Sequence, residues 1–245
     1  MSMELAWYCP SEGDGDRLGT HRPARAPDFA YLRATVLAAE VAGAHEVLVT
    51  TGDLNDSFSP EAAFMESWTT AAALAAATER VRLIVAVNPA AQEIDLIAHQ
   101  ATTLENVAPG RIAINLVAGG GPDTGYGAPE RDHGARYRRL GEMADAVRAA
   151  GFTGPFYLGG ASPEAVALAA RAADAYLMWG EPPEAIAERI SGMRAAAGER
   201  GLRFGLRIHI ISRDTRSEAR SAATALLADA TVSADRDAEF AAFDS

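Results

Sequence analysis

The architecture is set most firmly by one segment, Arg203-Phe204-Gly205-Leu206-Arg207-Ile208-His209-Ile210-Ile211. Side chains alternate between the two faces of a strand, so one face of this segment carries Phe204, Leu206, Ile208 and Ile210. The other face carries Arg203, Arg207 and His209. We therefore predict a strand over 204–211, with helices behind its apolar face and a ligand in front of its cationic face. Arginine keeps its charge inside a protein, so a buried Arg207 requires a negatively charged partner.

Six further strand-like segments precede it, most of them followed by a helical pattern, at 4–9, 46–50, 81–87, 111–117, 155–159 and 175–179. Helix starts are marked by Asp28, by Ser162-Pro163 and by the capping box of Thr215 and Glu218. Repeated strand–helix units with short connections predict a parallel sheet. A doubly wound sheet is covered by helices on both faces, so the polar face of 203–211 favours an α/β fold of the (β/α)₈ TIM-barrel type.

Active-site residues of such a barrel lie at the carboxyl ends of its strands, a rule that selects Trp179, Arg207 and His209. The turn Gly160-Ala161-Ser162 also follows a strand and leads into a helix N-terminus, where free N–H groups suit a phosphate. Most strand–glycine–helix junctions are simply tight turns, so this signal is weak by itself.

Composition excludes several classes of protein. A net charge of −11 over 245 residues, without a lysine- or arginine-rich block, argues against a nucleic-acid binder. Cys9 is the only cysteine, which excludes an internal disulfide and a thiolate metal cluster, and the histidines show no metal-ligand spacing. The first residues do not resemble a signal peptide, and no apolar run reaches membrane-spanning length. We expect a soluble cytoplasmic protein that binds neither metal nor membrane.

Five segments together carry a resemblance to a known family: 7–10 with the loop 13–20, 111–117, 132–137, 176–184 and 203–213. On these residues the chain resembles the bacterial luciferase-like flavin monooxygenases, and most closely the two-component alkanesulfonate monooxygenases. The resemblance implies a luciferase-like (β/α)₈ barrel forming a single domain over 1–245. Seven strands are visible, and the C-terminal unit that family members carry after the position of Ser245 is missing, so we expect an incomplete barrel.

The resemblance also implies a reaction. Family members use reduced FMN (FMNH2) from a separate NAD(P)H:FMN reductase, form a peroxyflavin with O2, and convert an alkanesulfonate to an aldehyde and sulfite, a step of sulfur metabolism. A sulfonate is a permanent anion, which a guanidinium can bind with two hydrogen bonds. A histidine nearby can move protons close to neutral pH.

Site residues are carried over by position. Arg207 resembles the arginine that holds the anion, His209 the histidine beside it, and Trp179 an aromatic wall of the site. Tyr137 and the Gly160-Ala161-Ser162 turn resemble the FMN phosphate site, and Asn115 lies on the strand that runs under the flavin ring in the family.

Two alternatives stay open. Phe64 stands where the family has an active-site cysteine, and the arginine-bearing C-terminal loop is absent, which favours a degenerate flavin-binding protein without catalysis. An oxidoreductase of the same superfamily that uses the deazaflavin F420 is the other alternative. Unpaired edges of an incomplete barrel also lead us to expect a homo-oligomer.

Overall fold

The structure is a computed structural model that describes residues 3–14, 23–51, 62–90, 92–119 and 132–229. Within these ranges, strands and helices alternate along the whole chain. The strands are β1 (Ala6–Tyr8), β2 (Glu46–Val49), β3 (Arg82–Val87), β4 (Ile112–Leu116), β5 (Phe156–Gly159), β6 (Ala175–Trp179) and β7 (Arg203–Arg207). The helices are α1 (Phe29–Val41), α2 (Ser67–Ala77), α3 (Ile94–Val107), α4 (His133–Ala149), α5 (Pro163–Ala172), α6 (Pro183–Ala197) and α7 (Arg216–Asp229).

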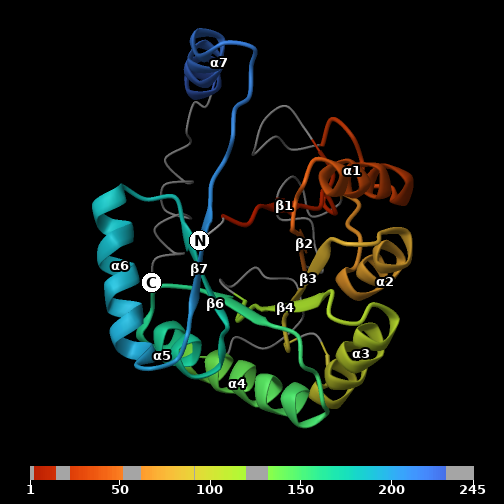
Figure 1. Cartoon of the computed structure of the whole chain (residues 1–245), viewed down its shortest axis with the longest axis vertical. Coiled ribbons are helices and arrows are strands. Elements are labelled where there is room, and N and C mark those ends of the chain that lie inside the picture. The colour runs from red at the N-terminus through yellow and green to blue at the C-terminus, as the bar shows by residue number, and fades with distance from the viewer. Residues whose placement is uncertain (1–2, 15–22, 52–61, 91, 120–131, 230–245) are drawn as a thin grey trace.

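The seven strands form one parallel sheet in the order β1-β2-β3-β4-β5-β6-β7. Figure 1 shows this sheet curled, with α1 to α6 around its outer side and α7 standing away from it at the top. The α/β fold expected from the sequence is therefore confirmed as a curled parallel sheet of the luciferase-like barrel type. A sheet with its strands in sequence order places all carboxyl ends on one rim, where barrel enzymes hold their active-site residues.

The sheet separates two apolar clusters. The larger cluster packs the outward side chains of the strands, such as Val85, Ile114 and Leu158, against helix residues such as Leu140 and Leu168. A smaller cluster lines the concave face and contains Leu48, Ile84, Ala86, Ala113, Tyr157 and Ala175. Residues paired across neighbouring strands share a face, so strand register decides which side chains enter the concave space.

Polar side chains cross this concave space at the amino ends of the strands. Arg82 Nη1 and the Tyr157 hydroxyl both donate to Glu46 Oε1, at 2.7 and 2.5 Å. Arg203 on β7 donates to the Tyr157 hydroxyl at 2.6 Å and forms a 2.7 Å ion pair with Glu4, just before β1. The curl of the sheet has thus brought its two edge strands close enough for direct side-chain contact.

The last strand is shorter than the sequence predicts. β7 ends at Arg207, because its only neighbour among the described strands, β6, ends at Trp179, the residue paired with Arg207. Among the described helices, α7 stands away from the sheet and does not cover the apolar alternation that continues beyond this point (Figure 1). Leu206, Ile208 and Ile210 are 48%, 57% and 69% exposed, so the described helices do not cover the whole apolar face as expected.

Helix starts agree with the sequence patterns. Asp28 and Ser162 accept hydrogen bonds from backbone N–H groups at the starts of α1 and α5. Thr215 and Glu218 form the reciprocal pair expected of a capping box. Residues 15–20 of the loop matched to the family lie outside the described residues. Among the helices that the structure describes, none has the length and apolar character needed to cross a membrane.

Candidate functional site

A cluster of hydrogen-bonding side chains lies where β5 ends and α5 begins. Ser162 Oγ accepts the Ala165 backbone N–H at 3.2 Å and lies 2.8 Å from His133 Nε2, at the start of α4. The Glu164 carboxylate is 3.4 Å from the same imidazole nitrogen. Two helix starts, α4 and α5, thus present their first-turn side chains to one point on the carboxyl-terminal rim.

The protonation of His133 follows from its neighbours. Arg136 Nη2 lies 3.2 Å from His133 Nδ1, and a guanidinium can only donate, so Nδ1 is the acceptor. The neutral imidazole then carries its proton on Nε2, which donates to Ser162 Oγ. Both lone pairs of the Ser162 hydroxyl are consequently used, by His133 and by the Ala165 N–H. Its own proton is then directed to the Tyr137 phenol, with which Ser162 forms a side-chain hydrogen bond.

Tyr137 adds a second hydroxyl to this cluster. Its ring lies 5.0 Å from that of His133, centroid to centroid. Burial raises the pKa of the Tyr137 phenol, while the Ser162 hydroxyl and the Arg136 charge lower it in part. The phenol therefore keeps its proton at neutral pH and is a hydrogen-bond donor. The Tyr137 O–H, oriented by Ser162 and His133 beside the N-terminus of α5, forms with the N–H groups of that helix start a suitable cradle for an oxyanion such as phosphate.

Gly160 shapes the cradle. Its φ of +125° lies in a region that side chains rarely adopt, and a Cβ there would lie 2.8 Å from Ala165 Cβ and 3.1 Å from the Tyr137 hydroxyl. The Tyr176 hydroxyl on β6 donates to the Gly160 carbonyl at 2.5 Å, which holds the turn against the neighbouring strand. Ala161, the next residue of the turn, is exposed. The structure thus brings together Tyr137 and the turn 160–162, as the sequence predicts.

A second cluster forms around Arg207, at the carboxyl end of β7. Its Cζ lies 4.2 Å from the centroid of the Trp179 ring on β6 and 4.4 Å from that of Tyr8 on β1. The guanidinium is therefore held between two aromatic faces, in a cation–π arrangement. Arg207 has no ion pair with a carboxylate among the residues described. Burial raises the pKa of the Tyr8 phenol, and the Arg207 charge lowers it in part.

The remaining predicted residues are more scattered. Asn115 pairs with Ala86 and Tyr157 and so lies half-buried on the concave face. His209 is exposed and lies beyond the end of β7, so it does not share a strand face with Arg207 as expected. Sequence reasoning treated His133 only as part of a matched segment and missed Tyr8. The position of Tyr8 at the carboxyl end of the first strand was the one available signal.

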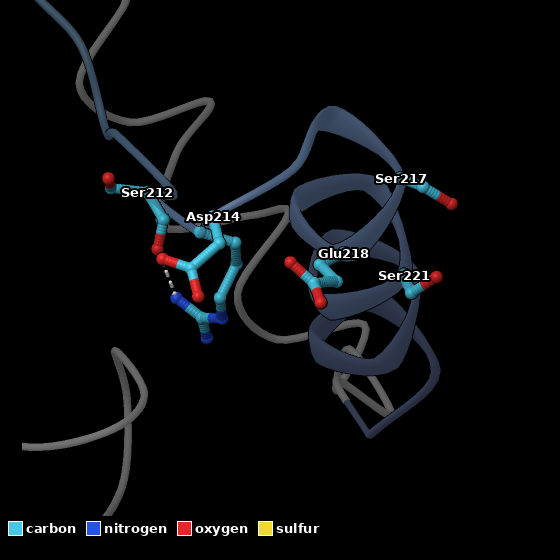
Figure 2. Close-up of a pocket in the computed structure, with 6 residues that line it drawn as sticks. Ser212, Asp214, Ser217, Glu218 and Ser221 are labelled. Carbon is cyan, nitrogen blue, oxygen red and sulfur yellow. Dashed lines mark hydrogen bonds between the residues drawn. The ribbon is translucent and has the colours of Figure 1, made fainter.

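A separate hollow of about 540 Å³ lies beside α7. Figure 2 shows its polar lining, which includes Ser212, Asp214 and Glu218. Arg213 Nη1 donates to the Ser212 carbonyl at 2.7 Å, and Glu218 is engaged in capping α7. All six lining residues are exposed, and α7 stands away from the rim. We therefore place the candidate site at the rim and not at this hollow.

Solved structures of similar fold are flavin- or deazaflavin-related proteins. The EDTA monooxygenase from Chelativorans sp. BNC1 superposes with a TM-score of 0.76 at 17% identity, covering 92% of this chain and 66% of that protein. The oxygenating constituent of 3,6-diketocamphane monooxygenase from the CAM plasmid of Pseudomonas putida, solved with FMN, gives 0.75 at 15% identity, covering 95% and 74%. An F420-dependent secondary alcohol dehydrogenase gives 0.63 at 16%, covering 84% and 68%.

At these identities the superpositions establish the fold alone, and this chain spans just under two thirds of the EDTA monooxygenase. Sequence comparison with protein families is more specific. The model of the luciferase-like monooxygenase family matches residues 3–154 and 150–244, which together include both rim clusters. The chain belongs to the luciferase-like monooxygenase family.

Proposed function

We propose that this protein is a flavin-dependent monooxygenase that uses reduced FMN and O2 to cleave an anionic alkanesulfonate into an aldehyde and sulfite. The observation that carries the proposal is that two groups of side chains suited to binding an anion lie on the same rim of the sheet. One is the donor cradle of His133, Tyr137 and Ser162. The other is the Arg207 guanidinium, which no carboxylate of the described chain neutralises.

The first of these places fits the phosphate of FMN. It combines the N–H groups at the start of α5 with the Tyr137 hydroxyl of α4, a combination suited to a phosphate ester. Asn115 on the concave face of β4 would then contact the flavin ring, which supplies two electrons for the activation of O2 when it is bound. A separate NAD(P)H:FMN reductase would provide the reduced flavin.

The second place fits the sulfonate. A guanidinium offers paired N–H donors to two sulfonate oxygens, and Trp179 would cover the apolar part of the substrate. His209 follows on the chain and is exposed, so it can exchange protons with solvent. In the overall reaction RCH2SO3⁻, O2 and FMNH2 give RCHO, HSO3⁻, FMN and H2O. The C–S bond breaks, one oxygen atom enters the aldehyde, and the other leaves as water.

The test is direct. The purified protein is supplied with O2, a panel of alkanesulfonates and reduced FMN regenerated by an unrelated reductase, and sulfite is measured by ion chromatography. We expect sulfite release that falls roughly 100-fold in Arg207→Gln, since the sulfonate loses its charge-assisted hydrogen bonds. Arg216→Gln, which removes an exposed guanidinium from α7, is the matched control and should keep full activity. A folded protein that releases no sulfite above the level without enzyme would exclude this activity.

A second function is favoured by the exposure of His209 and by the 51% exposure of Trp179. A protein that binds flavin without turnover needs the phosphate cradle but not an enclosed reaction site. Retention of FMN through gel filtration, with no sulfite formed, would support this function. Parallel titrations with F420 test the deazaflavin alternative, for which we expect weaker binding than for FMN.

A further inference from the structure

The two arginines on the concave face of β7 are in different electrostatic states. Arg203 is neutralised by Glu4 at 2.7 Å and also donates to the Tyr157 hydroxyl at 2.6 Å. Arg207, at the other end of the same strand, lies over two ring faces and forms no ion pair with a carboxylate of the described residues. A cation that is positioned but not neutralised is what an anion-binding site requires.

The two rings come from opposite edges of the sheet. Trp179 is the cross-strand partner of Arg207 on β6, so its contact follows from local pairing. Tyr8 lies on β1, whose ladder partner is β2, and it reaches Arg207 only because the sheet curls. The Arg207 Cζ lies over the face of each ring, and its N–H groups donate to no acceptor among the residues that the structure describes.

We propose that Tyr8 is a positioning residue: with Trp179 it clamps the Arg207 guanidinium so that its donor edge binds a compact oxyanion such as a sulfonate. The proposal rests on the proposed function in taking that anion to be the substrate. It adds a specificity determinant on β1, 199 residues away along the chain from Arg207. It predicts that sulfonate affinity depends on the aromatic ring of Tyr8 and not on its hydroxyl.

The experiment measures binding of pentane-1-sulfonate by calorimetry to the full chain and to the variants Tyr8→Phe, Tyr8→Trp and Tyr8→Leu. The first two keep an aromatic face and should bind within about 2-fold of the wild type. Tyr8→Leu should bind about 3- to 10-fold more weakly, as expected for loss of one cation–π contact at a partly exposed site. Trp7→Phe, at the neighbouring exposed position of β1, is the matched control and should not change the affinity.

Affinity for FMN separates this inference from the proposed function. Tyr8→Leu should bind FMN as tightly as the wild type, because the phosphate cradle lies at β5 and α5. If neither the wild type nor any variant binds FMN, the proposed function is contradicted, whereas the role of Tyr8 in sulfonate binding is not. Equal sulfonate affinity in Tyr8→Leu and the wild type, equal losses in Tyr8→Phe and Tyr8→Leu, or no sulfonate binding by the wild type would each overturn the clamp.

Discussion

The chemistry of the rim depends on which hydrogen-bond capacities are already used. Arg136 assigns the His133 tautomer, and His133 and the Ala165 N–H fill the lone pairs of Ser162. Ser162 in turn hydrogen-bonds the Tyr137 phenol, which keeps its own proton to donate. Arg207 similarly keeps its donor edge because aromatic faces replace a carboxylate. Both groups are arranged to donate, so each favours a ligand that carries negative charge.

Gly160 provides a test of the cradle at a single position. Gly160→Ala should lower FMN affinity at least about 10-fold and the free energy of unfolding by about 1–3 kcal/mol, because φ is positive and the added Cβ meets Ala165. Gly192→Ala in α6 is the control, since nothing lies within 4 Å of its Cβ. That change should stabilise the helix by about 0.5–1 kcal/mol and leave FMN affinity unchanged. Unaltered FMN binding in Gly160→Ala would rule out the turn as part of the site.

Cys9 is a second position with a measurable consequence. It is 3% exposed, and burial raises the pKa of its thiol to about 12. The neutral thiol therefore favours the folded state below about pH 9, and this contribution declines as pH rises toward 12. We expect no reaction with a thiol-specific disulfide reagent at pH 8 until denaturant unfolds the chain. Rapid labelling of the native protein at pH 8 would show that Cys9 is accessible.

Among the elements, β7 has two functionally different ends. Its amino end is anchored by Arg203 to Glu4 and Tyr157, which ties β7 to the region before β1 and to β5. Its carboxyl end presents Arg207 to the rim. The anchored end keeps the edges of the curled sheet together, and this proximity is what allows Tyr8 to reach Arg207.

The anchoring network has its own pH signature. Burial and the neighbouring Glu46 raise the pKa of Tyr157, with Arg203 opposing them. Its neutral hydroxyl therefore stabilises the fold fully below the ordinary tyrosine pKa of about 10, and this contribution is lost as pH rises through the higher folded-state pKa. Tyr157→Phe should lower the free energy of unfolding by about 1–3 kcal/mol at pH 7.

The control for this network is Tyr31→Phe, whose hydroxyl donates to Asp14 at an exposed position. That substitution should change stability by less than about 0.5 kcal/mol. Chemical denaturation at pH 7 and pH 11 measures both variants against the wild type. Equal stability of Tyr157→Phe and the wild type at pH 7 would mean that the network does not stabilise the fold.

Element boundaries were predictable where neighbours on both sides continue the ladder. The inner strands, for example β3 and β6, end within a residue or so of the sequence expectation, because apolar runs are flanked by clear turn and cap signals. The apolar alternation after Arg207 did not predict where β7 ends, because a strand also needs a neighbouring strand to pair with, and the ladder with β6 ends at Arg207. Tyr8 was not predictable from local patterns, because its contact with Arg207 depends on the curl of the whole sheet.

At the scale of the molecule, exposed apolar side chains lie on β7 and just beyond its carboxyl end. Leu206 and Ile208 are 48% and 57% exposed, and β7 pairs with β6 alone among the described strands. Such edges favour association between chains. We expect concentration-dependent self-association in sedimentation velocity, and a shift to monomer for the double variant Leu206→Lys, Ile208→Lys.

The control for this surface is Val41→Lys, an 82% exposed apolar residue of α1, a helix that lies away from β7 in Figure 1. It should leave the sedimentation profile unchanged. A wild-type protein that remains monomeric over the whole concentration range would contradict the expected association. The prediction of a homo-oligomer from the sequence depends on this measurement.

The central claim is that the start of α5 holds the phosphate of a flavin, and anaerobic titration of reduced FMN into the full chain tests it most directly. Ser162→Ala removes the cap of α5 and a hydrogen-bonding hydroxyl of the cradle, whereas Asp28→Ala removes the cap of α1 and an exposed ion pair with Arg25. Both should lose about 1 kcal/mol of stability, but only Ser162→Ala should lose affinity for FMN, by about 10-fold or more. Equal FMN affinity in the two variants, or no binding by the wild type, would contradict the account.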